Sequence, residues 1–479
     1  MLFSSPAFLF VFLPYVLLLY YAVDFRFKNY LLFFASLIFY IWGESELVLI
    51  LLLSITVNYL GGLCIFKYID NWKSKLFLSF AVFLNLAALI FFKYANFIVD
   101  NINHVTGHQV FTLQKVHLPL GISFFTFQGI CYVVDVYRKK VEAQKNPYNL
   151  ALATAMFPHQ IAGPIIRYND IADQIIFRKY DWTIFSGGIQ RFIIGLAKKM
   201  LIANTLGAVA DKIFTLGPDT LPMNVAWLGT VCYALQIYYD FSGYSDMAIG
   251  LGRMFGFTFL ENFNFPYAAT SIKDFWRRWH ISLSSWFRDY VYISLGGDRI
   301  SRIRTYINLI IVFFLTGLWH GAGWNFIVWG IFHGFFLVLE RLGFENLLKK
   351  VWRPVQHGYT LFVVLIGWVF FKANDLPSAL HYLKSMFGFV QGDVANYFLQ
   401  FVNPQIVVAA FVGIAFSFPI HLLVNQLVLR FGSKASSFPK IASQAIAQST
   451  GVFIYLMLFL LSLMTVASST YNPFIYFRF

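Results

Sequence analysis

The sequence predicts an all-α protein that crosses a membrane many times, because apolar residues dominate its composition and recur in long segments. Of its 479 residues, 59% are hydrophobic and 20% aromatic, and only 12% are charged. Soluble domains average about 25% charged residues, so a soluble globular protein is excluded. A membrane-spanning helix needs about 20 mostly apolar residues. Such segments lie near residues 6–23, 29–43, 46–65, 76–93, 118–137, 189–209, 225–240, 306–320, 324–340, 358–371, 404–428 and 451–468.

The sequence has three regions of different composition, which together form one predicted membrane domain, residues 1–479. Residues 1–137 are dense apolar segments with short loops, and residues 341–479 are again mostly apolar. Residues 150–340 mix polar and aromatic residues, beginning with the Pro- and Gly-containing stretch 157–164. Pro and Gly interrupt helices, and irregular backbone is tolerated at membrane depth only where protein buries it or it lines a cavity. We therefore expect a re-entrant turn at 157–164, and the chemistry in this central region.

The net charge of +14 does not indicate a nucleic-acid-binding protein, because the cations lie beside apolar segments, where orientation signals belong. The predicted cytoplasmic loops hold Arg26, Lys28, Lys67, Lys73, Lys75, Arg138, Lys139, Lys140 and Lys145. The predicted outside loops hold only Lys93 and Lys115, with Glu44 and Glu46. Arg430, Lys434 and Lys440 precede the last segment, so both termini are expected outside the cytoplasm. The cysteines Cys64, Cys131 and Cys232 have no spacing typical of disulfides or of a metal site.

A histidine stands in the apolar, Trp-containing segment Thr316–Gly321, and its pattern recurs downstream around His333. Histidine titrates near neutral pH, and an ionisable residue at membrane depth indicates a functional site. His320 is therefore the first catalytic candidate, and a hydrogen bond between two helices is the alternative of about equal weight. We expect His333 to bridge helices and His159 to line the cytoplasmic entrance.

Two further central passages carry polar residues among apolar ones. Asp240 and Asp246 are six residues apart, which is not one face of a helix, so we expect Gly243 to break the helix between them. The passage 275–290 holds Arg277, Arg278 and Arg288, and guanidinium groups bind phosphates in bidentate fashion. An interfacial amphipathic helix is the alternative that its Trp and Arg residues favour. Candidate substrate-binding residues are Asp246, Trp276, Arg277, Arg278, Asp289 and Trp319.

These passages together resemble the membrane-bound O-acyltransferase (MBOAT) family, and within it the bacterial branch that acetylates polysaccharides such as alginate and peptidoglycan. The resemblance covers residues 1 to about 375 and matches His320 to the essential histidine of the family and His280 to a second one. It implies a ring of about 11–13 transmembrane and re-entrant helices around a central funnel or tunnel in the bacterial cytoplasmic (inner) membrane. It also implies acetyl-CoA as the donor substrate, no permanently bound cofactor, and an acceptor on the outer side.

That implication agrees with a physical requirement, since a glycan outside the membrane cannot reach acetyl-CoA inside it. We expect His320 to act as general base on the acceptor hydroxyl, a role worth about 10²- to 10⁴-fold in rate. The expected role of His280 is to orient the acceptor or hold the donor, and a structural hydrogen bond is its alternative. Trp319 Nε1 is one candidate donor to the developing oxyanion.

The last six residues, 474–479, read Phe-x-Tyr-x-x-Phe. This pattern resembles the C-terminal hexapeptide of the small membrane partner in teichoic acid D-alanylation, in which the tyrosine is implied to carry the acyl group. A phenol of pKa about 10 is a better leaving group than a sugar alcohol, so an acyl-Tyr476 would stay activated for a second transfer. The alternative is an aromatic anchor at the membrane interface.

Two functions follow from these features. The first is an acetyltransferase that passes acetyl through Tyr476 to an extracytoplasmic SGNH-type or related transferase, with a slight preference for a peptidoglycan acceptor. The second is a transporter or flippase, in which polar residues of broken helices bind a solute. Transport requires neither a proton-transferring histidine nor a terminal tyrosine motif.

Overall fold

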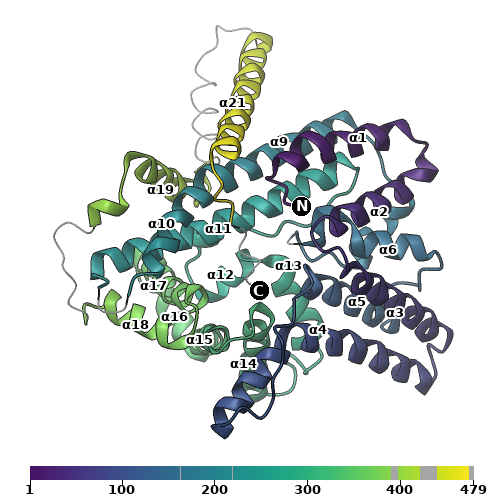
Figure 1. Cartoon of the computed structure of the whole chain (residues 1–479), viewed down its shortest axis with the longest axis horizontal. Coiled ribbons are helices and arrows are strands. Elements are labelled where there is room, and N and C mark those ends of the chain that lie inside the picture. Colours follow the sequence, from purple (N-terminus) through teal and green to yellow (C-terminus); the bar gives the residue numbers. More distant parts are fainter. Residues whose placement is uncertain (162, 218–219, 390–397, 421–439, 474–479) are drawn as a thin grey trace.

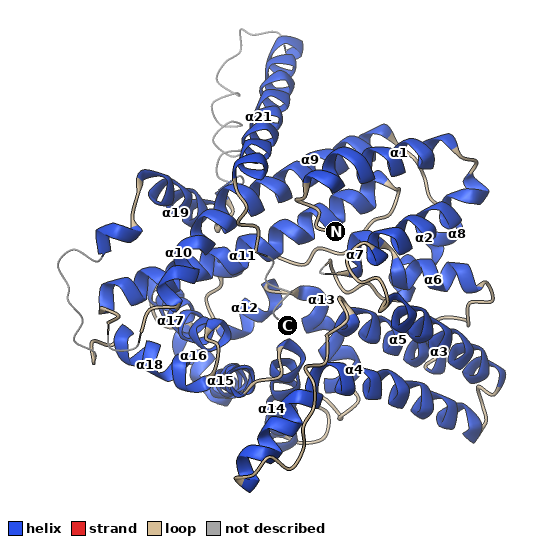
Figure 2. Ribbon diagram, in the orientation of Figure 1, coloured by secondary structure: helices blue, strands red, loops and turns tan. Residues whose placement is uncertain are grey.

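A computed structural model describes residues 1–161, 163–217, 220–389, 398–420 and 440–473. All of the regular secondary structure in these residues is helical (Figure 2). The predicted all-α class is therefore confirmed. Each of the twelve predicted apolar segments contains a helix in its described part.

The first third of the chain forms a bundle of helices joined by short loops. These helices are η1 (Phe8–Phe12), α1 (Leu13–Ala22), α2 (Phe25–Ile41), α3 (Val48–Lys67), α4 (Trp72–Thr106), α5 (Ile122–Tyr137), α6 (Pro147–Ala155), α7 (Phe157–Gln160) and α8 (Tyr168–Ile176). Side-chain caps start three of them, because Asp24 accepts from Arg26 N, Asn71 accepts from Lys73 N and Asn146 accepts from Tyr148 N. Gly107, at a φ of 68°, ends α4 in the left-handed conformation that glycine adopts without strain.

The centre and the last third alternate long helices with short ones. The central helices are α9 (Trp182–Ala197), η2 (Lys198–Ala203), α10 (Asn204–Phe214), α11 (Met223–Met254), η3 (Pro266–Ala268), α12 (Ile272–Arg278), α13 (Ile281–Trp286), η4 (Phe287–Tyr292), α14 (Arg302–His320) and α15 (Trp324–Leu339). The later ones are η5 (Glu340–Phe344), α16 (Glu345–Leu348), α17 (Arg353–Lys372), α18 (Leu376–Met386), η6 (Phe398–Phe401), α19 (Pro404–Phe416) and α21 (Lys440–Ser468). In Figure 1 the long helices surround the short helices α12 and α13.

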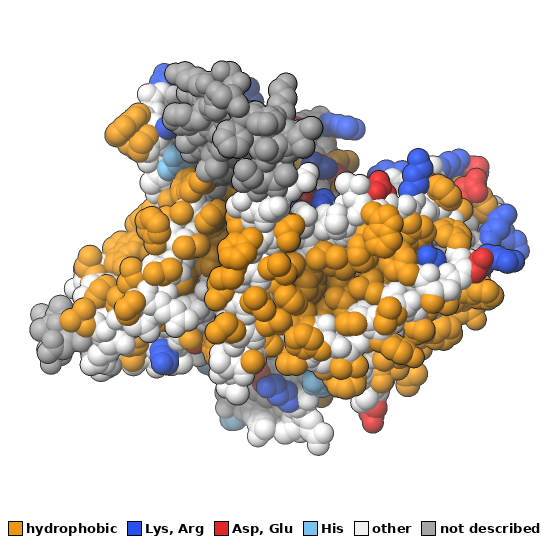
Figure 3. All heavy atoms as spheres, turned by 90° about the horizontal axis from the view of Figure 1, so that it is seen from above, with side chains coloured by type: hydrophobic (Ala, Val, Ile, Leu, Met, Phe, Trp, Pro, Cys, Tyr) orange, Lys and Arg blue, Asp and Glu red, His pale blue; other side chains and the backbone are white. Residues whose placement is uncertain are grey.

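Long apolar helices with exposed apolar side chains define a multi-pass membrane protein. Seven helical segments of the described chain are long and apolar enough to cross a membrane: 48–67, 72–106, 182–214, 302–320, 324–348, 353–372 and 448–468. Apolar side chains cover the middle of the face shown in Figure 3, and charged side chains lie mainly toward its margins. Large apolar side chains such as Leu18, Phe83 and Phe411 are exposed, as expected of residues that face lipid.

The predicted helix break at Gly243 is wrong, because α11 is continuous from Met223 to Met254. A Cβ atom on Gly243 would lie 2.7 Å from the carbonyl oxygen of Gly195 in α9, and one on Gly250 would lie 2.6 Å from that of Gly188. Small residues at such crossings let two membrane helices approach closely. Gly243 therefore serves helix packing, and the central core forms around this crossing.

The irregular element predicted at 157–164 is present, because the four-residue helix α7 is followed by non-helical chain at 164–167. His159 does not line an entrance as predicted. It is fully buried, and its Nδ1 lies 3.0 Å from Gln128 Nε2 of α5. Protein therefore surrounds this interruption, which meets the condition for irregular backbone at membrane depth.

Several cations that the orientation argument placed in loops lie within helices instead, and Lys93 and Lys28 are the most informative of them. Lys93 lies well inside α4, which continues to Thr106. Lys28 is buried in α2, where its Nζ lies 4.7, 5.1 and 4.2 Å from the ring centroids of Tyr20, Tyr21 and Tyr180. Aromatic faces attract cations, so Lys28 has a packing role that the sequence pattern did not indicate.

The α9–α11 crossing predicts opposite effects at two neighbouring glycines. A Cβ atom at Gly188 would lie 2.7 Å from Gly250 O, whereas one at Gly187 would meet no atom within 4 Å. We expect Gly188→Ala to lower the unfolding free energy by about 1–3 kcal/mol, because backbone must move. Gly187→Ala should leave stability unchanged or raise it, because alanine favours helix.

Thermal unfolding of both variants in the same detergent checks this prediction. Equal midpoints for Gly188→Ala and Gly187→Ala would contradict the close crossing.

Candidate functional site

His320 is the last residue of α14 and is buried, with 4% of its surface exposed. Three aromatic rings surround its imidazole. The ring centroids of Trp319, Trp329 and Phe371 lie 4.9, 5.0 and 5.0 Å from that of His320. The helix ends there because Gly321 adopts extended backbone, at a φ of −169°. The catalytic candidate is thus held where helical backbone gives way to an irregular segment.

The end of α14 is held by two consecutive residues of α4. The last four carbonyls of a helix lack partners within the helix. Lys93 Nζ donates to the carbonyl of Trp319, and Tyr94 Oη donates to the carbonyl of Leu318. A cation at a helix C-terminus also interacts favourably with the helix dipole. Lys93 and Tyr94 therefore both cap this end of α14.

A glycine contact brings the same end of α14 against α15. A Cβ atom on Gly317 would lie 2.3 Å from Phe326 O, and one on Gly330 would lie 2.2 Å from Phe313 O. This close crossing places Trp329 of α15 against the imidazole of His320. The Trp-Gly pattern around His333 therefore packs against the pattern around His320.

His280 occupies the break between α12 and α13, with φ 45° and ψ 55°. A non-glycine residue in this left-handed region stores strain, which is common at functional sites. Its Nδ1 lies 3.2 Å from Asn262 Oδ1, an acceptor that also binds Ser282 N and Oγ at 3.2 and 2.9 Å. Since Asn262 Oδ1 accepts, His280 Nδ1 carries the hydrogen, and Nε2 is left as the basic nitrogen.

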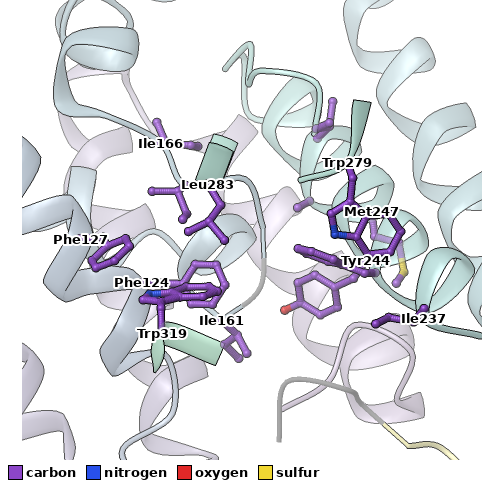
Figure 4. Close-up of a cluster of buried hydrophobic side chains, with 14 of the residues drawn as sticks. Phe124, Phe127, Ile161, Ile166, Ile237, Tyr244, Met247, Trp279, Leu283 and Trp319 are labelled. Atoms are coloured by element: carbon purple, nitrogen blue, oxygen red, sulfur yellow. The ribbon is translucent and has the colours of Figure 1, made fainter. Parts of the chain in front are cut away.

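Trp319 connects the two histidines. Its ring centroid lies 6.0 Å from that of His280 and 4.9 Å from that of His320. Phe124 and Phe127 of α5 pack against the same indole, and Figure 4 shows all three rings in one buried cluster. The Nε1 of Trp319 is buried and has no hydrogen-bond partner among the described residues. The indole therefore offers a donor at the centre of the site.

A pocket of about 210 Å³ reaches Trp319 from the loops before α3 and α5. Glu44 and His117 of those loops line it and lie 3.1 Å apart, measured from carboxylate oxygen to imidazole nitrogen. Lys93, Ser123 and Trp319 also line it. Glu44 and His117 lie in segments predicted to face outside, so an approach to the site from that side stays a prediction.

The passage 275–290 is not the interfacial amphipathic helix that its composition favoured. It is broken at His280, and Phe275, Trp276, Trp279 and Trp286 are buried. Trp276 packs against Phe313, Trp329 and His333, which places it in the core beside the site. The passage is therefore part of the core, because its aromatic side chains are buried.

The polar residues of the passage 275–290 lie at its edges. Arg277 is exposed, and Arg278 Nε donates to Asp274 Oδ1 at 2.9 Å. Asp289 pairs with Arg288 at 2.6 Å and with Arg167 at 2.8 Å. Partial burial opposes a fall in the pKa of Asp289, but hydrogen bonds from both arginines outweigh it, so this pKa is lowered. These three candidates lie away from the His320 cluster of rings.

The carboxylates of α11 are both held by cations of α9 and η2. Asp246 pairs with Arg191 and Lys198, each at 2.6 Å. Asp240 pairs with Lys199 at 2.6 Å, and both of these side chains are buried. Asp246 is therefore part of an ion-pair network, although it was a candidate for substrate binding.

His333 is fully buried and packs between α12, α15 and α17, stacking on Phe275 and bordering Trp276 and Trp329. Neither ring nitrogen has a hydrogen-bond partner within the described chain. It bridges helices as expected, but through ring contacts.

A segment that follows α21, residues 469–473, is held against the central helices by polar contacts. Lys199 Nζ donates to Pro473 O, and Asn204 Nδ2 donates to Tyr471 O at 3.3 Å. The hydroxyl of Tyr471 donates to Asp211 at 2.6 Å, and Asn472 pairs with Ser4 at 3.0 Å. We call residues 469–473 the C-terminal strap. Tyr476, the predicted acyl carrier, lies outside the described residues.

Sequence reasoning missed Lys93 and Lys199. Both are cations inside long apolar helices, and that placement was the available signal. Their partners, carbonyls of α14 and a carboxylate of α11, are distant in sequence. In the described residues, no group of three His, Cys, Asp or Glu side chains gathers as metal ligands would.

Long apolar helices around two buried histidines define a multi-pass membrane protein with a candidate site in its interior. The model of the membrane-bound O-acyltransferase family matches residues 34–374. The chain therefore belongs to this family, and it is an acyltransferase.

Named relatives cover much of the chain. A probable alginate O-acetylase of Pseudomonas aeruginosa is 40% identical, with 100% of both chains aligned. A peptidoglycan O-acetyltransferase of Helicobacter pylori is 35% identical over 91% of this chain and 90% of its own length. A teichoic acid D-alanyltransferase of Bacillus subtilis is 30% identical over 52% of this chain and 66% of its own length. These findings favour the acyltransferase interpretation over the transporter alternative.

The Lys199–Asp240 pair predicts a large loss of stability when one partner is removed. Lys199→Met leaves a buried carboxylate without its cation, so we expect unfolding free energy to fall by about 3–5 kcal/mol. Lys139→Met is the matched control, because Lys139 and Asp70 form an exposed pair of the same length, 2.6 Å. Exposed ion pairs contribute little to the unfolding free energy, so this control should be nearly as stable as the wild type.

Unfolding of both variants in mixed micelles measures the difference. A Lys199→Met protein as stable as Lys139→Met would contradict the structural importance of the buried pair.

Proposed function

We propose that this acyltransferase moves an acetyl group from cytoplasmic acetyl-CoA to a polysaccharide outside the bacterial cytoplasmic membrane, with His320 as general base. The observation that carries the proposal is the position of Trp319. Its indole packs on both histidines and lines the pocket that enters from the predicted outer side. An acceptor that enters this pocket would meet Trp319 beside His320.

In the proposed reaction, the imidazole of His320 accepts the proton of an acceptor hydroxyl. The hydroxyl oxygen forms a bond to the thioester carbonyl carbon, and the carbon–sulfur bond breaks. The CoA thiolate leaves with the electron pair of that bond and takes up a proton. Trp319 Nε1, which is buried at this position, supports the proposal as a donor to the developing oxyanion.

His280 is proposed to orient the reacting groups. Its Nδ1–H is held by Asn262, so the basic Nε2 is fixed in orientation. We also propose that Arg277 and Arg278 bind the phosphates of CoA. Asp289 and Trp276 are proposed to support the passage 275–290, which carries these arginines. Asp246 is proposed to act indirectly, by holding Arg191 and Lys198 in place.

The first acceptor is proposed to be Tyr476, which would pass acetyl to an extracytoplasmic SGNH-type or related transferase. The strap supports this relay, because Pro473 is bound by Lys199, whose partner Asp240 adjoins Phe241. The ring of Phe241 packs on His280 at 4.6 Å. Tyr476 follows Pro473 by three residues, which span about 10 Å when extended. The strap thus limits the range of the tyrosine.

The final acceptor is proposed to be a polysaccharide of the cell envelope or matrix. Higher identity to the alginate O-acetylases than to the peptidoglycan O-acetyltransferase gives more support to an alginate-type polymer than to peptidoglycan. Supplying membranes with labelled acetyl-CoA and either purified polymer distinguishes the two.

Replacement of the proposed base should abolish transfer. We expect His320→Ala to lower acetyl-CoA consumption by at least about 100-fold, because the proton acceptor is lost. His381→Ala is the control, since His381 is exposed on α18. Purified proteins and radiolabelled acetyl-CoA provide the assay.

Near-normal transfer by folded His320→Ala would exclude this histidine as the base. Absence of any acetyl-CoA consumption by the wild-type protein would oppose acetyl-CoA as donor.

The relay predicts a covalent intermediate. After incubation with labelled acetyl-CoA, mass spectrometry of the wild-type peptide containing residues 474–479 should find one acetyl group on Tyr476. The label should disappear in Tyr476→Phe and in His320→Ala, and it should persist in the matched Tyr455→Phe. Turnover of acetyl-CoA without label on Tyr476 would refute the relay and leave the enzyme assignment intact.

A further inference from the structure

Lys93 is a charged residue inside a long apolar helix, and its surroundings contain no carboxylate partner among the described residues. Its Nζ donates to Trp319 O and to Ser123 Oγ, the latter at 3.4 Å. An ammonium has three donors, so these two acceptors leave one further donor at the pocket wall. Charged groups at membrane depth are costly and are retained where they have a function.

The contact made by Lys93 differs from that of its neighbour Tyr94. Tyr94 binds the carbonyl of Leu318, one residue farther from the histidine, and carries no charge. Lys93 binds the peptide that joins Trp319 to His320, and its ammonium lies 5.7 Å from the centroid of the Trp319 indole. The two residues thus cap the same helix end, but of the two only Lys93 lines the pocket and lies over the indole that packs on both histidines.

We propose that Lys93 is a positioning residue for acyl transfer, which acts by holding the Trp319–His320 peptide at the floor of the pocket. This inference rests on the proposed function and deepens it. Lys93 fixes the direction of the His320 imidazole and of the Trp319 indole, so that the acceptor entering through the pocket meets both.

Three variants separate positioning from simple helix capping. Lys93→Met removes the charge and the donor and keeps an unbranched side chain of similar length. Lys93→Arg keeps the charge. Tyr94→Phe removes the adjacent cap alone and leaves the carbonyl of Leu318 without this donor. All three are made in the full chain and assayed with acetyl-CoA.

We expect Lys93→Met to lower kcat at least 10-fold and to leave the KM for acetyl-CoA within 2-fold of the wild-type value. Lys93→Arg should recover several-fold of the lost kcat, and Tyr94→Phe should keep kcat within 3-fold. Hydrogen–deuterium exchange supplies a measurement that does not depend on activity. Amides of residues 318–323 should exchange faster in Lys93→Met than in Tyr94→Phe.

The inference is overturned if Lys93→Met keeps its kcat, or if Lys93→Met and Tyr94→Phe lose kcat and thermal stability in parallel. Unchanged amide exchange in Lys93→Met overturns it even when no activity is measurable. A His320→Ala protein that remains active refutes the proposed base instead. An inactive His320→Ala with a fully active Lys93→Met refutes only the role of Lys93.

Discussion

The structure depends on backbone-to-backbone approach at glycines. In the membrane, apolar burial does not favour one helix–helix contact over lipid, so close packing and polar contacts must select the arrangement. Gly317 and Gly330 let α14 meet α15, and that contact brings Trp329 onto His320. Glycines likewise let α9 approach α11 closely. The polar groups of the site are then placed by helices that have little freedom to shift.

Aromatic rings complete this arrangement by packing around the two candidate histidines. Trp319 packs against both His280 and His320, and Phe371 and Trp329 pack against His320. Rings with polar edges suit this task, because they fill space and still offer a hydrogen-bond donor. The candidate site is therefore densely packed near the histidines, and the pocket reaches it at Trp319.

Much of this was predictable from the sequence, and what was not has a common cause. Apolar length predicted the membrane helices, and an ionisable residue among Trp and Gly residues identified His320. Gly243 was misinterpreted because a glycine at a helix crossing and one at a helix break have the same local sequence. Lys93 and Lys199 were overlooked because their partners, Trp319 and Asp240, lie far away in the chain. The local sequence pattern predicts the helices, whereas contacts between residues distant in the sequence decide the role of each polar side chain.

The contact between Asn472 and Ser4 joins residues that are separated by 468 positions. A ribosome makes the second of them long after the first has entered the membrane. The buried ammonium of Lys199 donates to the carbonyl of Pro473, which is also made much later. Chains that have not yet reached residues 472 and 473 would therefore insert in the membrane without the contacts that hold Ser4 and Lys199 in the assembled core.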